Sequence, residues 1–101
     1  MTTIPTPSGL AGAPLDELKQ WLAITGSADD ELLVRLLDAA YRMCIQFTRI
    51  EPVEWDSLDS GLRHGIIRFA AHQYRQRDTG EEAQIPTSVA ALWRPWRGLR
   101  L

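Results

Sequence analysis

The residues from Asp56 to Thr79 carry the most regular apolar pattern in the chain and constrain its fold more than any other stretch. Side chains suited to a core recur there at spacings of three and four, which places them on one face of an α-helix. They are Leu58, Leu62, Ile66, Phe69, Ala70, Gln73 and Tyr74. A second flank is also partly apolar, so we expect this helix to be central and covered on more than one side. That flank holds Gly65, Ile67 and Ala71.

Polar residues mark the ends of this helix. A short side chain between Ser57 and Asp59 is suited to cap its first turn, and Gly80 favours a left-handed C-terminal end. The segment before it, from Asp30 to Arg49, predicts a second long helix of roughly 20 residues. A capping box opening at Ser27 would start that helix, and Pro52 lies just past its end. A loop from Ile50 to Trp55 then joins two antiparallel helices.

Shorter helices are expected on both sides of this pair. Pro14 opens a helix running to Ile24, whose inner face holds Leu15, Leu18 and Leu22 with Trp21 beside it. Pro86 opens the last helix, and Pro95 is expected to end it. The predicted fold is therefore all-α: one domain over residues 1–101, a small bundle of two long antiparallel helices plus short N-terminal and C-terminal helices. Residues 1–13 form an arm and residues 94–101 a tail.

Composition excludes several classes of function. The 101 residues have a net charge of −2, which argues against a general nucleic-acid binder, and no apolar run is long enough to cross a membrane. The single cysteine, Cys44, lies on an apolar helix face and is interpreted as a buried thiol. His64 and His72 are eight residues apart and no known metal-binding motif surrounds them. We therefore expect no catalytic site, no metal and no cofactor.

A helix-turn-helix DNA-binding regulator is one alternative, because the turn at residues 25–30 separates a short helix from a long one. The second helix, however, would open with Asp29, Asp30 and Glu31 where a recognition helix meets phosphates. Three carboxylates at that place would be repelled.

The C-terminal segment is unusually rich in aromatic and basic residues. From Ala83 onward the chain has three arginines and no acid, and both Trp and Arg are enriched at interface hot spots. One interpretation is that the tryptophans only cover the core. The other is a docking tail with apolar anchors and flanking arginines. The anchors are Trp93, Trp96, Leu99 and Leu101, and the arginines are Arg94, Arg97 and Arg100.

The order of these pieces resembles the gp6-like phage head–tail connector family, the small α-helical adaptors of long-tailed phages and gene transfer agents. The likeness covers roughly Pro14 to Arg97. It begins with LDELKQWL and the acidic entry TGSADDELL. Its most characteristic pieces are the run from Ala70 to Arg75 with Arg77, and the run IPTSVAALWRPWR from Ile85 to Arg97.

The resemblance implies a non-enzymatic virion protein at the head–tail interface, assembled in the bacterial cytoplasm. It implies a ring of about 12 subunits beneath the portal protein, joined to a head-closure (stopper) or tail-terminator protein, with DNA only as passing cargo. The tail from Trp93 to Leu101 would then dock on the portal. A generic helical protein–protein interaction domain remains the main alternative, and infectious phage and gene transfer agent both remain open as the source.

Overall fold

The fold was analysed in a computed structural model that describes residues 9–77 and 84–97, and every regular element in these ranges is helical. The order is α1 (Ala13–Leu22), α2 (Asp30–Thr48), the 3₁₀ turn η1 (Trp55–Ser57), α3 (Ser60–Arg75) and α4 (Thr87–Arg97). The all-α prediction is therefore confirmed.

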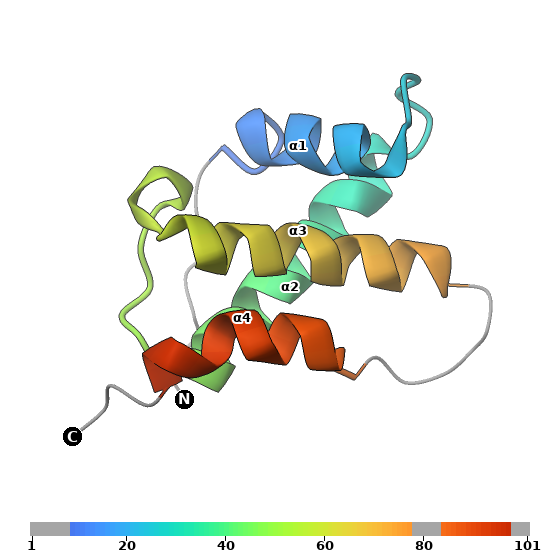
Figure 1. Ribbon diagram of the computed structural model, residues 1–101. Helices are drawn as coiled ribbons and strands as arrows, with labels where there is room; N and C mark the ends of the chain where they lie inside the picture. Colours follow the sequence, from blue (N-terminus) through green and yellow to red (C-terminus); the bar gives the residue numbers. More distant parts are fainter. Residues whose placement is uncertain (1–8, 78–83, 98–101) are drawn as a thin grey trace, which may run out of the picture.

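Helix α3 lies at the centre of the bundle, as its two apolar flanks predicted. It packs against each of the other three helices. In Figure 1, α1 lies on one side of α3 and α4 on the other, while α2 passes obliquely behind them. The two long helices α2 and α3 run in broadly opposite directions, and α4 runs back along α3.

One hydrophobic core joins all four helices. Of the face predicted for α3, the residues from Leu58 to Ala70 are buried, whereas Gln73 and Tyr74 are half-buried. Leu10 is also buried, and its carbonyl accepts a hydrogen bond from the Leu15 N–H at 3.1 Å. The end of the segment predicted to be an arm thus packs on the core.

Both long helices begin where the sequence predicted, but only the predicted cap of α3 forms. Helix α3 begins at Ser60, because the preceding turn η1 buries Trp55 and leaves Asp59 as the cap. The Asp59 carboxylate accepts a hydrogen bond from the Gly61 N–H at 3.0 Å. Helix α3 ends at Arg75, and Gly80, its predicted C-terminal cap, lies outside the described residues.

The capping box predicted at Ser27 does not form. Asp29 occupies the N-cap position of α2 without a side-chain capping bond. Its carboxylate instead accepts a hydrogen bond from the Tyr74 hydroxyl, and Asp30 pairs with Lys19 at 2.8 Å. Bonds to α3 and α1 therefore replace the local cap.

The prediction that Pro95 ends the last helix is wrong, since α4 continues to Arg97. Pro95 lies in the final turn, so its missing N–H removes only the bond to the Ala91 carbonyl. The following residue, Trp96, packs against α3: a Cβ placed on Gly61 would lie 3.3 Å from the Trp96 ring. This packing helps hold the last turn.

Gly65 and Trp93 set the distance between α3 and α4. A Cβ on Gly65 would lie 2.2 Å from Trp93 Nε1, far inside contact distance. The Trp93 indole N–H donates to the Leu62 carbonyl at 3.3 Å, and its ring packs near Phe47 and Phe69, with ring centroids 6.0 and 6.1 Å away. Only glycine at position 65 lets the Nε1 edge of the indole approach the α3 backbone this closely.

We expect Gly65→Ala to destabilise the protein, although alanine favours a helix. The clash with Trp93 should cost about 1–3 kcal/mol beyond the gain of ~1 kcal/mol from helix propensity. Gly61→Ala is the matched control, because its new methyl group would lie 3.3 Å from the rim of Trp96 and 3.4 Å from the Asp59 carboxylate, without a severe clash. Urea unfolding of both variants measures the difference, and equal stability would contradict the role assigned to Gly65.

Candidate docking surface

The predicted docking residues divide into buried and exposed positions along α4. Trp93 is fully buried (0% exposed), and its single polar atom is bonded within the core. In this fold Trp93 offers no exposed surface to a partner, because its whole side chain lies in the core, and its role as an anchor stays a prediction. The interpretation that a tryptophan covers the core holds for this residue.

The end of α4 does present the other residue types expected. Arg94 and Arg97 are exposed, and Trp96 is half-buried. The Arg97 guanidinium lies over the Phe47 ring, 5.0 Å from its centroid. Leu99, Arg100 and Leu101 lie outside the described residues. Among the described residues, the docking hypothesis therefore concerns Arg94, Trp96 and Arg97.

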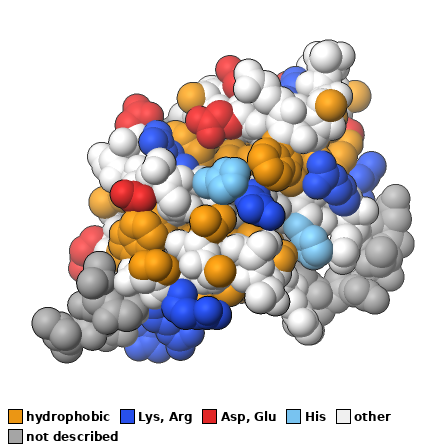
Figure 2. All heavy atoms as spheres, in the orientation of Figure 1, with side chains coloured by type: hydrophobic (Ala, Val, Ile, Leu, Met, Phe, Trp, Pro, Cys, Tyr) orange, Lys and Arg blue, Asp and Glu red, His pale blue; other side chains and the backbone are white. Residues whose placement is uncertain are grey.

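Trp21 marks a second exposed surface, which the sequence analysis did not identify. It is 43% exposed and is the one large hydrophobic side chain that is exposed among the described residues. The His64 ring meets it edge-on at 5.4 Å, and the Arg68 guanidinium lies 5.8 Å from its ring centroid. Figure 2 shows Arg and His side chains around hydrophobic atoms in the middle of this face.

The basic side chains of this surface follow the helical repeat of α3. We call the set of His64, Arg68, His72 and Arg75 the α3 basic stripe, because intervals of four, four and three residues align them on one side of the helix. The spacing was visible in the sequence. It becomes informative only because α1 leaves Trp21 exposed beside it.

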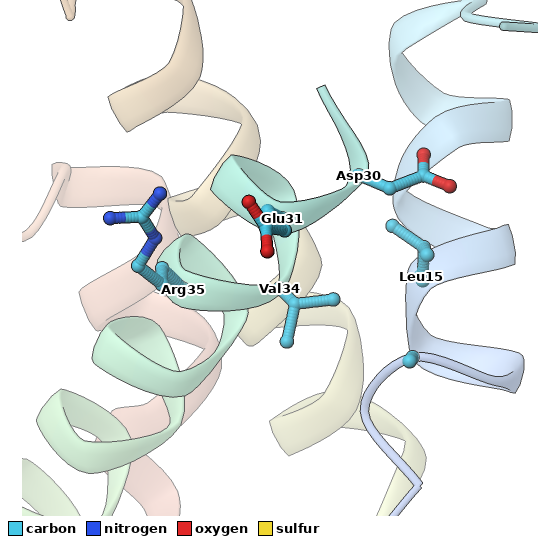
Figure 3. Close-up of a pocket in the computed structure, with 6 residues that line it drawn as sticks. Leu15, Asp30, Glu31, Val34 and Arg35 are labelled. Carbon is cyan, nitrogen blue, oxygen red and sulfur yellow. The ribbon is translucent and has the colours of Figure 1, made fainter. Parts of the chain in front are cut away.

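A groove between α1 and α2 has a volume of about 780 Å³. Leu15 and Val34 face one another across it (Figure 3). The charges at its edge are mixed: the Asp30 carboxylate points toward α1, where Lys19 binds it, and the Arg35 side chain points away. This groove has no predominant charge that would select a ligand.

The described residues contain no arrangement typical of catalysis. No group of three or more His, Cys, Asp or Glu side chains within residues 9–77 and 84–97 is placed to hold a metal ion. Burial raises the pKa of the Cys44 thiol to about 12, so the nucleophilic thiolate is not formed near neutral pH. None of the described helices is long and apolar enough to span a membrane.

The start of α2 does not suit a DNA-reading helix. Asp29 and Asp30 are already bonded to Tyr74 and Lys19, and Glu31 is exposed beside them. A helix that meets the phosphates of a major groove with carboxylates would be repelled. This arrangement disfavours the helix-turn-helix alternative.

The model of one family, the phage gp6-like head-tail connector proteins, matches residues 13–97. This range runs from the first residue of α1 to the last residue of α4. The chain belongs to this family. No curated protein and no solved structure matches it.

Membership in the family establishes the general role. Head–tail connectors are structural proteins of the phage particle rather than enzymes, and they interact with other head and tail proteins. The resemblance noted in the sequence is thus confirmed, and the protein is a virion component.

The two tryptophans of α4 should differ sharply on truncation. Trp93→Ala removes a fully buried ring and should cost about 3–5 kcal/mol of the free energy of unfolding. Trp96→Ala removes a half-buried ring and should cost clearly less. Thermal or urea unfolding measures both, and equal losses would contradict the assignment of Trp93 alone to the core.

Cys44 should not react with a thiol reagent such as dithionitrobenzoate at pH 8 in the folded protein. The thiol is inaccessible, and pH 8 lies far below its pKa of about 12, so the neutral form persists. Reaction should become complete in denaturant, which returns the pKa to its ordinary value. Rapid labelling of the native protein would show that the core around Cys44 opens readily.

Proposed function

We propose that the protein is the adaptor that forms a ring beneath the portal and links it to the head-closure or tail components. DNA passes through the lumen of this ring. The observation that carries the proposal is the family match across the whole helical domain, from Ala13 to Arg97. The exposed end of α4 supports it, because it offers a surface for another chain.

The docking segment of this adaptor comprises the end of α4 and the residues that follow. Arg94 and Arg97 are exposed cations beside a half-buried indole, Trp96, which combines the residue types found at the centres of interfaces. Arginine also binds carboxylates in two parallel hydrogen bonds, so an acidic portal surface is the complement we expect. Leu99, Arg100 and Leu101 extend the same chemistry along the sequence.

Mixing the purified protein with purified portal tests this proposal by electron microscopy. A ring seated on the portal is the expected result. A chain that stays monomeric and never binds the portal would instead indicate a generic interaction domain.

Arg94→Glu should weaken portal binding about tenfold or more, because reversal of an interface arginine replaces attraction with repulsion. The fold should be unaffected, since Arg94 is exposed. Arg35→Glu makes the same charge change at an exposed position of α2 and is the control. Surface plasmon resonance with immobilised portal measures the affinities.

Deleting Gly98 to Leu101 provides an independent measurement of the same segment. The shortened chain should keep its circular dichroism spectrum and melting temperature but bind the portal more weakly. Unchanged affinity in both the deletion and Arg94→Glu would refute docking by this segment.

A further inference from the structure

Charge is segregated along the chain between Ile50 and Arg77. Residues 50–59 contain four acids and no base, and we call this segment the acidic loop; its acids are Glu51, Glu54, Asp56 and Asp59. Residues 60–77 contain four arginines and no acid. The net charge of −2 conceals this contrast, because the two segments cancel one another.

The fold places the acidic loop at one end of the molecule. It connects α2 to α3 at the end opposite the C-terminus of α3 (Figure 1). All four acidic side chains are exposed. The loop backbone is held in place by Tyr41, whose hydroxyl donates to the Val53 carbonyl and accepts from the Val53 N–H, both at 3.1 Å.

The other end carries the C-terminal half of the α3 basic stripe. Trp21, Arg68, His72 and Arg75 line a depression of about 150 Å³, together with Ser88 at the start of α4. Within the described residues the ion pairs are Lys19–Asp30 and Arg42–Asp38, so neither Arg68 nor Arg75 is neutralised by one. The exposed Trp21 indole therefore lies beside two arginines, and neither forms an ion pair with an acid of the described residues.

We infer that the acidic loop of one copy of this chain docks on the α3 basic stripe of the next copy. This inference rests on the proposed ring and specifies its subunit contact. A closed ring needs two different surfaces on each subunit, one meeting the other on its neighbour. The acidic loop adjoins the start of α3 and the C-terminal half of the α3 basic stripe lies toward its end, so the two oppositely charged surfaces are separated along this helix.

The apolar parts of the two surfaces also match. Trp21 lies at the edge of the stripe, and the acidic loop carries the half-buried Pro52 and Val53. Covering the indole with these side chains supplies apolar contact, while the surrounding charges fix the register of the subunits.

DNA is a less suitable occupant of the stripe. Basic and aromatic groups repeated around a lumen would bind phosphates and bases strongly, which would impede DNA that has to pass. The acidic loop, by contrast, offers a fixed complement on the same chain. The stripe therefore belongs at the contact between subunits.

Two charge reversals test the contact on the intact chain. Arg75→Glu makes the stripe repel the loop, and Asp56→Arg makes the loop repel the stripe. Each variant alone should lower the fraction of portals that carry a ring by at least about tenfold. Electron microscopy of the protein mixed with portal measures this fraction. Arg35→Glu and Glu31→Arg reverse exposed charges elsewhere and should form rings normally.

Combining the reversals should restore the ring. A chain carrying both Arg75→Glu and Asp56→Arg regains a complementary pair at every contact. An equimolar mixture of the two single variants should also form rings, with the variants alternating. Circular dichroism spectra equal to that of the wild-type protein establish that loss of rings is not loss of fold.

Three results would overturn the inference. Rings that withstand both single reversals would leave the proposed function intact and exclude this contact, and failure of the combined variant to recover would exclude a direct contact. Loss of duplex DNA binding in Arg75→Glu with normal rings would assign the stripe to DNA. A wild-type chain that forms no ring on the portal would refute the proposed function itself.

Discussion

The contact between Trp93 and Gly65 determines how the rest of the bundle is arranged. An indole pressed against a helix backbone fixes the distance and rotation of α4 relative to α3, and the same ring also reaches Phe47 on α2. Three helices thus meet at one side chain. The missing Cβ matters as much as the ring, because any larger residue at position 65 would push Trp93 away from α3 and disturb its packing on Phe69.

The centre of the fold was predictable, because burial of α3 on several sides leaves a strong periodic signal. Its residues from Leu62 to Ala70 were identified from spacing alone, and α1 and α2 from theirs. The capping of α2 and the C-terminal end of α4 were not, because contacts distant in sequence decide them. The Tyr74 hydroxyl donates a hydrogen bond to the Asp29 carboxylate, 45 residues away, and Trp96 packs against α3 beyond Pro95. Nothing in the local sequence around Ser27 reveals that bond.

The candidate surfaces show a similar limit. Residue type indicated that the C-terminal segment is suited to docking, but it did not distinguish Trp93 from Trp96, three positions apart on α4. Which of the two faces α3 depends on the rotation of the helix, and the tight packing at Gly65 fixes that rotation. Trp21 was placed only beside the inner face of the first helix, and the sequence did not reveal that it lies 43% exposed next to His64 and Arg68.

Helix α3 is fastened at both ends, by the Asp59 cap at its start and by the Tyr74 hydroxyl bonded to Asp29 near its finish. Ordering a flexible backbone costs about 1–2 kcal/mol per residue, and a segment already fixed avoids most of that loss on association. The side chains along α3 are therefore held on an ordered helix, and a partner that binds them orders little additional backbone.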